Sequence, residues 1–407
     1  MGWQESCVEE EKQRFVAAWL GGEWSRTELC ARFGVSRETG YELMRRYGLE
    51  GVCCVQARSR ARHEQGGATS ARLVQAIVDL RVSRPHWGPK KLQACLEQRH
   101  PEEAWPAAST IGDIVKRHGL VSGRRRRRSA LVQHRPFATA DAANALWCVD
   151  FKGWFRTGDG ERCDPLTVTD AASRYLLACV IVPPTRAGVQ PVMDRLFREH
   201  GLPGAIRSDN GPPFGSTGAG GLTRLGVHWL KLGIALERIE PGQPQQNGRH
   251  ERMHGTLKAE TLRPPAATAA EQQDRFDRFR EMFNQERPHE ALRQTPPSRH
   301  WQASARLYPD PIEAPTYGAD HVVRRVRSNG EIKWRGDLIF LSEVLAGERV
   351  GIVETDTGES IVRFAGLDLG LINRAGTKLR RFTAPRPGRR EADPQPASKT
   401  VNHVTGP

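Results

Sequence analysis

The sequence predicts a multidomain protein: all-α helix-turn-helix modules at the N-terminus, a central α/β domain with a mixed sheet, and a small C-terminal β-barrel. Three observations lead to this prediction. Residues 1–121 carry helical patterning with capping signals, and apolar strands alternate with helices between residues 142 and 287. Between residues 320 and 375, turn signals recur about every 8–10 residues, as in a small barrel. The 407 residues leave room for several such domains.

The charge of the chain predicts a polyanionic partner. The net charge is +14, and the first 135 residues hold 24 Lys and Arg against 15 Asp and Glu. Such a balance is typical of proteins that bind nucleic acid. The eight cysteines form no C-x-x-C pair, so we expect reduced thiols. The chain has no signal-peptide pattern and no run of 18 apolar residues, so we expect no membrane contact and a cytoplasmic location.

Residues 1–50 predict the first helix-turn-helix. Ser25 and Glu28 form a capping-box pattern, and after a tight glycine turn Ser36 can cap a helix over residues 37–47. The second helix of this motif lies in the major groove, which predicts DNA contacts from Arg37, Thr39, Arg45 and Arg46. The alternative is a helical hairpin with solvated charges. Gly40 counts against the motif, because glycine inside a helix costs about 1 kcal/mol relative to alanine.

A linker over residues 51–69 and a second helix-turn-helix-like module over residues 70–121 follow. Residues 122–135 form an arginine-rich linker that contains Arg124, Arg125, Arg126, Arg127 and Arg128. Consecutive like charges repel each other, so this run is expected to stay extended and to follow a DNA backbone without sequence choice. The alternative is a solvated run with no dedicated site.

The central domain is predicted from its order of apolar segments. Three strand-like stretches come first, then a helix, a strand, a helix, a strand and a helix, which is typical of a mixed α/β sheet. The predicted strands are Leu146–Phe155, Pro165–Asp170, Tyr175–Val182, a fourth ending at Asp209, and Ala235–Ile239; the predicted helices include Val189–His200, 248–262 and 271–287.

Three acidic residues are the candidate catalytic site. Asp150 lies within an apolar strand, where a carboxylate is costly unless a cation or hydrogen bonds compensate. Asp209 ends another strand, ahead of a sharp Asn-Gly turn, and Glu251 lies one turn into a helix. Three carboxylates without a Cys or His cluster suit Mg²⁺, which prefers oxygen ligands. Two such ions can activate an attacking oxygen and stabilise a leaving one, which is the chemistry of phosphodiester cleavage.

Helical phase selects Glu251 over the other nearby acids. At 100° per residue, Glu251 shares one face with His254 and Lys258, whereas Glu260 points elsewhere. We expect His250 and His254 to be surface or packing residues instead of ligands.

The sequence motifs around these acids resemble the integrase catalytic core of DDE transposases, a ribonuclease H-like family shared with retroviral integrases. The resemblance covers residues 136–304 and rests on four motifs: Trp147-x-x-Asp150, Ser208-Asp209-Asn210-Gly211, Pro244-Gln245-Gln246-Asn247-Gly248-x-x-Glu251-Arg252 and Leu257-Lys258-x-Glu260. It implies that Asp150, Asp209 and Glu251 are the metal-binding catalytic triad and that Lys258 contacts DNA. Asp170 and Arg174, in Thr169-Asp170-x-x-Ser173-Arg174, match a further motif that we interpret as structural.

Two features depart from the family. Forty-one residues separate Asp209 from Glu251, more than is usual, and we assign the excess to a glycine-rich loop insertion at residues 215–221. The N-terminal His/Cys zinc module of retroviral integrases is not visible. The expected cofactor is therefore Mg²⁺, with Mn²⁺ as a possible substitute, and no zinc is predicted.

The resemblance implies a transposase of a bacterial insertion sequence. Such an enzyme binds the terminal repeats of its element and target DNA, both double-stranded, and cuts and joins strands as a homodimer or higher oligomer, associated with the nucleoid. Two alternatives remain: a catalytically silent DNA-binding regulator with the same fold, or a ribonuclease H-like nuclease. At the C-terminus, residues 320–382 are predicted to form the barrel and residues 383–407 a disordered tail.

Overall fold

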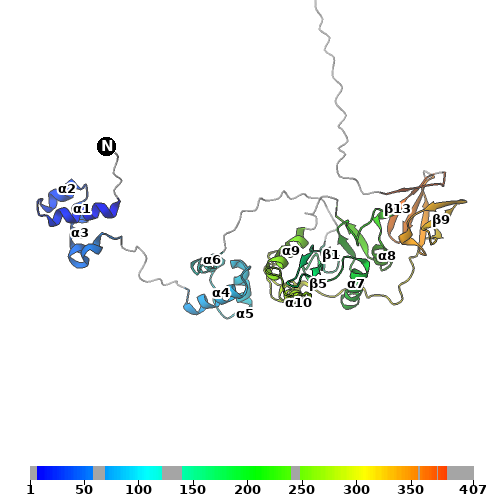
Figure 1. Ribbon diagram of the computed structural model, residues 1–407, viewed down its shortest axis with the longest axis horizontal. Coiled ribbons are helices and arrows are strands. Elements are labelled where there is room, and N and C mark those ends of the chain that lie inside the picture. The colour runs from blue at the N-terminus through cyan, green and yellow to red at the C-terminus, as the bar shows by residue number, and fades with distance from the viewer. Residues whose placement is uncertain are drawn as a thin grey trace, which may run out of the picture. The chain divides into compact units, whose positions relative to one another are not determined.

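The computed structural model describes residues 7–57, 69–121, 140–239, 248–355, 358–373 and 375–382. These residues belong to two compact units, Met1–Thr69 and Ser70–Pro407 (Figure 1). The run from Arg124 to Arg128, the segment before α9 and the predicted C-terminal tail lie outside the described residues. Within the described residues, no helix has the length and apolar character needed to cross a membrane.

The first unit is a helical domain with the predicted caps. Its helices are α1 (Val8–Leu20), α2 (Arg26–Arg32) and α3 (Arg37–Glu50), followed by the 3-10 helix η1 (Gly51–Val55). The capping box of Ser25 and Glu28 is present, and the Ser36 hydroxyl accepts a hydrogen bond from the Thr39 backbone at 3.1 Å. Cys54 and Val55 of η1 are buried in this core, so the packed domain continues beyond residue 50, into the segment predicted as a linker.

Gly40 is a packing residue within α3. A Cβ atom at this position would lie 2.3 Å from the Cys30 Sγ and 3.1 Å from the Phe15 Cζ. Real Cβ atoms do not approach other atoms so closely, so only glycine lets α3 pack this tightly against α1 and α2. The mid-helix glycine that counted against a helix-turn-helix is thus a consequence of how these helices pack.

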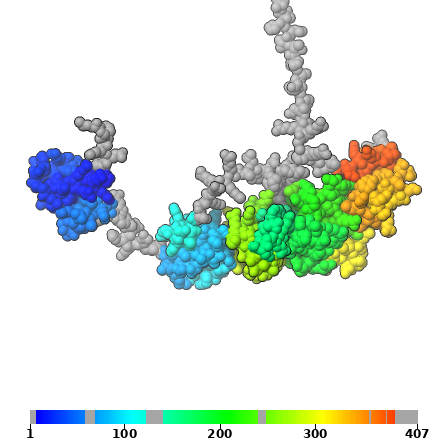
Figure 2. Space-filling model, in the orientation of Figure 1, coloured from blue at the N-terminus to red at the C-terminus, as the bar shows by residue number. Residues whose placement is uncertain are grey.

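The second unit begins with three helices, α4 (Ala71–Ser83), α5 (Pro89–Arg99) and α6 (Ala108–Arg117). Trp87, Leu92 and Ile111 are among the side chains that form their buried core. Arg84 and Arg99 each donate a hydrogen bond to Glu286 at 2.9 Å, just after α10 (Ala269–Gln285). Figure 2 shows the pale blue surface of these helices lying against the yellow-green surface of the central domain. The helical module is therefore attached to the central domain through ion pairs at its surface.

The central sheet is mixed, as predicted, with the strand order β5-β4-β1-β6-β7. Neighbouring strands run antiparallel from β5 to β1 and parallel from β1 to β7. This arrangement is the ribonuclease H-like architecture that the resemblance implies. The strands are β1 (Leu146–Phe151), β4 (Pro165–Asp170), β5 (Leu176–Ile181), β6 (Ala205–Ser208) and β7 (Ala235–Arg238), with the small hairpin β2 (Phe155–Arg156) and β3 (Arg162–Cys163) after β1.

Helices cover both faces of this sheet (Figure 1). One face packs on α7 (Arg186–His200) and α8 (Arg224–Lys231), and the other on α9 (Gly248–Thr261) and α10. Trp147 and Val149 of β1 are buried in the core on the α7 side. Since side chains alternate along a strand, Cys148 and Asp150 face α9. The pleat of β1 therefore directs the first candidate carboxylate toward the helix that carries the third.

The C-terminal region forms two antiparallel sheets. A five-stranded sheet has the order β14-β13-β12-β11-β8, and β9 and β10 form a separate hairpin. In the described part of this region β8 and β14 are the outer strands and do not pair, so the predicted barrel is not confirmed. The strands are β8 (Val322–Arg325), β9 (Glu331–Trp334), β10 (Asp337–Phe340), β11 (Arg349–Glu354), β12 (Ser360–Phe364), β13 (Leu367–Ile372) and β14 (Leu379–Arg381).

The C-terminal sheets share a core with the central domain. Leu222, Val227 and Leu230, in and before α8, pack in one buried cluster with Leu369 of β13. The 3-10 helix η2 (Ala219–Gly221) belongs to the same contact, so the segment predicted as a loop insertion supports the C-terminal sheets. The remaining 3-10 helices are η4 (Glu290–Leu292), η5 (Pro297–His300) and η6 (Glu343–Leu345).

Candidate active site

Asp150 and Asp209 come from neighbouring parallel strands. In the register of β1 and β6, Trp147 lies opposite Ile206, and Cys148 lies opposite Arg207. Continued by two residues, the same register sets Asp150 opposite Asp209. Both carboxylates therefore lie at the carboxyl ends of adjacent strands, which is where α/β sheets carry functional groups.

Glu251 approaches these two acids from α9. It lies in the first turn of the helix, and its side chain is exposed. Burial raises the pKa of Asp150 to about 7, and the negative charges of Asp209 and, to a smaller extent, Glu251 add to this increase. Both other acids therefore act on Asp150, but the ligand atoms of the three carboxylates do not all lie within 4.8 Å of one another in the described residues.

Asp209 has an unsatisfied oxygen. Its Oδ1 is buried and has no hydrogen-bond partner among the described residues. Burial also raises the pKa of this carboxyl. An orphaned carboxylate oxygen on the strand next to a second carboxylate, Asp150, is the setting that a bound cation would relieve. The donor set therefore fits a divalent metal.

Two buried histidines of α9 meet Thr167, which lies opposite Asp150 on β4. The Nε2 atoms of His250 and His254 each lie 2.7 Å from the Thr167 Oγ1. The Nδ1 of His250 lies 2.7 Å from the Thr169 Oγ1, so both of its ring nitrogens are engaged. Burial lowers the pKa of His250 to about 3 and that of His254 to about 2, so both rings are neutral at physiological pH. His250 is therefore buried, with both ring nitrogens in contact with threonine hydroxyls.

The tautomer of His254 leaves a lone pair directed at the acids. The Thr167 hydroxyl donates its proton to the Asp150 carbonyl at 3.1 Å, so His254 must donate its Nε2 proton to Thr167. Its Nδ1 is then unprotonated and lies 4.0 Å from the Asp150 Oδ2. Asp150 and the two histidines form the cluster among the described residues whose ligand atoms could hold a metal ion. The prediction that no zinc binds is not tested by this geometry.

The other nearby acids are already paired. Glu260 forms an ion pair of 3.0 Å with Arg287, and Glu237 forms one of 2.8 Å with Arg207. Lys258 is exposed on α9, two turns beyond Glu251. Glu260 therefore faces Arg287 and points away from the side of α9 that carries Glu251, in line with its helical phase.

The candidate DNA contacts of α3 differ in their surroundings. Arg37 and Thr39 are exposed at the start of the helix, and Arg45 is exposed beside Glu42, to which it donates a hydrogen bond at 2.8 Å. The side chain of Arg46 is only 13% exposed and pairs with Glu50 at 3.1 Å. Arg46 is therefore held within its own domain, whereas the other three side chains are exposed enough to reach a groove.

The position of His254 beside Asp150 does not follow from the sequence. A surface or packing residue is predicted there, and the ring is buried with its Nδ1 4.0 Å from the Asp150 Oδ2. A partial signal was present, because His254 lies three residues after Glu251 on the same face of α9. What could not be foreseen is the threonine of β4 that fixes its tautomer, since that contact is remote in sequence.

Comparisons with known proteins agree with this architecture. An integrase core domain model matches residues 140–244, a second matches residues 232–297, and a helix-turn-helix domain model matches residues 11–53.

Two relatives come from bacterial insertion elements, and both are uncharacterised proteins. The 31.7 kDa protein of insertion element IS407 from Burkholderia multivorans is 29% identical over 231 residues, which cover 56% of this chain and 79% of that protein. The 39.2 kDa protein of IS476 from Xanthomonas euvesicatoria is 29% identical over 235 residues, 57% of this chain and 64% of that protein. Among solved structures, the HTLV-2 integrase catalytic core domain in complex with magnesium is 15% identical and covers 40% of this chain and 99% of its own, with a TM-score of 0.31.

The matched models give the chain an integrase core domain and a helix-turn-helix domain, and they support an integrase-type polynucleotidyl transferase. The similarity to proteins of the insertion elements IS407 and IS476, together with the integrase core and helix-turn-helix matches, supports a DDE transposase of an insertion sequence that acts on DNA.

Proposed function

We propose that Asp150, Asp209 and Glu251 hold divalent metal, Mg²⁺ with Mn²⁺ as a substitute, and carry out DNA strand cleavage and strand transfer. The observation that carries this proposal is the buried Asp209 Oδ1, which has no donor among the described residues. Asp150 supports it, because two neighbouring negative charges and burial disfavour its ionised form unless a cation compensates.

The reaction is two successive displacements at phosphorus. In the first, water attacks a phosphodiester at the end of the element, and the bond to the 3′ oxygen breaks to leave a 3′-hydroxyl. In the second, that hydroxyl attacks a phosphodiester of the target DNA, and one strand is joined while another 3′-hydroxyl leaves. When bound, the metal supplies Lewis-acid stabilisation of the charge that develops on the phosphate oxygens. The protein's own carboxylates would hold the metal and so determine where the reacting phosphate lies.

His254 supports the first carboxylate. Its lone pair on Nδ1 faces the Asp150 Oδ2 across 4.0 Å, and its other nitrogen is fixed by Thr167. A ring held in this way can join Asp150 as a nitrogen ligand, and its fixed orientation limits how the carboxylate turns.

We propose that the protein contacts DNA at several places. We assign the exposed residues Arg37, Thr39 and Arg45 of α3 to the terminal repeats, and Arg124 to Arg128 to the backbone between domains. Lys258 lies on the Glu251 face of α9 and would contact a phosphate near the cut. Joining two element ends requires two active sites, so we propose a homodimer or higher oligomer on DNA, at work in the bacterial nucleoid.

A strand-transfer assay with the full-length protein, Mg²⁺ and the element's own ends tests this function. We expect Asp150→Asn and Glu251→Gln to abolish joining while gel-shift binding of the ends is retained. The matched controls are Asp274→Asn and Glu281→Gln, two exposed acids of α10, which should join ends like the original protein.

The assignment fails if either active-site variant still joins ends at the original rate. It also fails if the chelator EDTA leaves joining intact, because carboxylates alone cannot stabilise the charge of the transferred phosphate.

A further inference from the structure

A cavity of about 590 Å³ lies beside α9, apart from the three acids. Its floor is buried and includes Cys148, Thr169 and His250, and its rim includes the exposed side chains of Arg249 and Arg252. The volume falls within the range of ligand sites in proteins. The cavity is therefore both enclosed at its base and open to solvent at its mouth.

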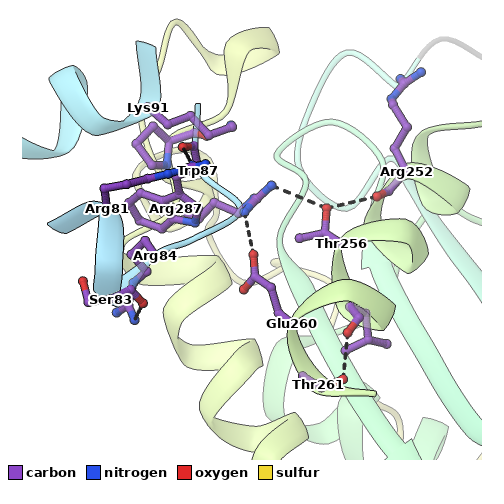
Figure 3. A network of polar contacts seen from close by, with 12 residues as sticks. Arg81, Ser83, Arg84, Trp87, Lys91, Arg252, Thr256, Glu260, Thr261 and Arg287 are labelled. Atoms are coloured by element: carbon purple, nitrogen blue, oxygen red, sulfur yellow. Dashed lines mark hydrogen bonds and ion pairs between the residues drawn. The ribbon is translucent and has the colours of Figure 1, made fainter. Parts of the chain in front are cut away.

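Cations dominate the lining of this cavity. Five of the lining side chains are basic: Lys91, Arg174, Arg249, Arg252 and Arg287. Arg287 is neutralised by Glu260 at 3.0 Å, as Figure 3 shows. Within the described residues, none of the other four forms an ion pair with a carboxylate of the lining. A basic cavity without its counter-charge is typical of an anion site.

The two acids of the lining do not supply that counter-charge. The Asp170 Oδ1 accepts hydrogen bonds from the backbone and the hydroxyl of Ser173 at 2.7 and 2.6 Å, and its Oδ2 accepts one from the Asn144 backbone at 2.8 Å. Glu290 is exposed, and its Oε1 lies 3.6 Å from the Nζ of Lys90, which does not line the cavity. Asp170 thus stabilises a turn, as the sequence motif suggested, and leaves the arginines without a carboxylate partner.

Arg174 is the central cation. It adopts a left-handed backbone conformation with φ of 67°, which a residue with a side chain rarely takes. Its guanidinium donates one hydrogen bond to the Ala171 carbonyl at 2.7 Å. Burial lowers the pKa of Arg174 to about 10, and the positive charges of Arg249 and Arg252 act in the same direction. Such crowding of like charges is costly in the free protein and is relieved when an anion enters.

The helix α9 separates this cavity from the catalytic acids. At 3.6 residues per turn, Arg249, Arg252 and Thr256 lie about 100° to 160° around the helix from Glu251. Thr256 faces the cavity residue Arg287, from which its hydroxyl accepts a hydrogen bond of 3.4 Å (Figure 3). One helix therefore presents a carboxylate to one side and a pair of arginines to the other.

We propose that this cavity binds a phosphate group of the DNA on which the protein acts, held by Arg174, Arg249 and Arg252, with Lys91 at its edge. The inference rests on the proposed action on DNA and adds a contact outside the catalytic site. Guanidinium groups suit this ligand, because each can donate two parallel hydrogen bonds to a phosphate. A phosphate held here would fix the DNA relative to α9, and so relative to Glu251.

The test is DNA binding by the full-length protein as a function of salt, followed by fluorescence anisotropy of a labelled element end. The slope of log K against log salt falls by about 0.9 for each DNA phosphate that the protein no longer neutralises. We expect Arg249→Gln and Arg252→Gln each to reduce the slope, by at most that amount, because both side chains share one phosphate with Arg174. Both side chains are exposed, so these variants should fold. The control is Arg278→Gln, an exposed arginine of α10 outside the cavity, whose slope should stay unchanged.

An unchanged slope in both cavity variants, or an equal reduction in the Arg278→Gln control, would overturn the proposal. A free phosphate compound is the other source of the same ligand chemistry. Calorimetric titration with tripolyphosphate, with the original protein and Arg174→Asn, separates the two sources. Tripolyphosphate binding that needs Arg174, together with unchanged DNA slopes, would overturn DNA as the source.

The inference and the proposed function fail separately. If Asp150→Asn abolishes joining while the cavity variants bind DNA with the original slope, only the cavity proposal is wrong. If the cavity variants show a reduced slope but the original protein cuts no DNA in any metal, the proposed catalytic function is wrong and the phosphate site stands.

Discussion

At the scale of single residues, Thr167 organises the candidate active site. Its hydroxyl is the common hydrogen-bond partner of His250 and His254 and also donates to the Asp150 carbonyl. All of these groups are buried or nearly so. A buried hydroxyl with three partners fixes the geometry around Asp150 more strictly than its carboxylate alone can.

Thr167→Val should destabilise the central domain more than Thr169→Val. The first change leaves the Nε2–H groups of two histidines unsatisfied, whereas the second removes a single partner of His250. Each buried polar group left without a partner costs about 1–3 kcal/mol. The free energy of unfolding in urea measures the difference, and equal losses in the two variants would contradict this account of Thr167.

The three candidate acids could be selected from the sequence because each belongs to a local pattern. Asp150 lies in an apolar strand, Asp209 precedes an Asn-Gly turn, and Glu251 has a defined phase on its helix. His254 and the arginine-lined cavity could not be predicted, because their surroundings come from segments far apart in the sequence. The cavity, for example, brings Lys91 together with Arg174 and Arg252.

At the scale of elements, α3 contains two glycines with opposite roles. A Cβ at Gly40 would collide with Cys30 and Phe15, whereas a Cβ at Gly48 would meet nothing within 4 Å. Sequence propensity alone treats the two positions alike, since glycine weakens a helix at either one. Only the packing of α1 and α2 against α3 distinguishes them.

Gly40→Ala should destabilise the helix-turn-helix domain, and Gly48→Ala should stabilise it. The crowded methyl at position 40 costs about 1–3 kcal/mol, more than the gain of about 1 kcal/mol in helix propensity that alanine brings at either position. Thermal unfolding followed by circular dichroism, in the full-length protein, gives both signs. A stabilising Gly40→Ala would show that these helices have room to separate.

At the scale of the whole second unit, the order of elements was predictable but the contacts between domains were not. The mixed sheet follows from apolar strands alternating with helices, whereas the barrel was inferred from turn spacing alone, which does not determine whether the outer strands pair. The joint between the helical module and the central domain is formed by Arg84, Arg99 and Glu286, and the glutamate lies 187 residues or more beyond either arginine. A contact between residues so far apart in the sequence cannot be predicted from a local sequence pattern.

Lys91 of α5 lies at the same joint, where its ammonium donates a hydrogen bond to the Pro288 carbonyl, and it should make stability depend on pH. Burial, with a smaller effect of Arg287, lowers the pKa of Lys91 from 10.5 to about 8. Between these values the unfolded chain binds a proton that the folded chain does not, so this lysine increases stability as the pH rises from about 8 to 10.5. The variant Lys91→Met lacks this dependence.

The measurement is urea unfolding of the original protein and Lys91→Met at several pH values. The stability of the original protein relative to the variant should increase over that interval. A constant difference between the two would show that Lys91 is solvated.

The contact between η2, α8 and the C-terminal sheets has a consequence for any attempt to isolate the catalytic domain. A fragment that ends at residue 304 would expose Leu222, Val227 and Leu230 to water, because their cover is supplied by residues beyond 320. Exposed apolar surface of this kind promotes aggregation. We therefore expect residues 136–304 to be poorly soluble on their own and residues 136–382 to remain monodisperse in size-exclusion chromatography. The smallest independently folding central domain would then extend well past Glu251, the last of the three proposed catalytic residues.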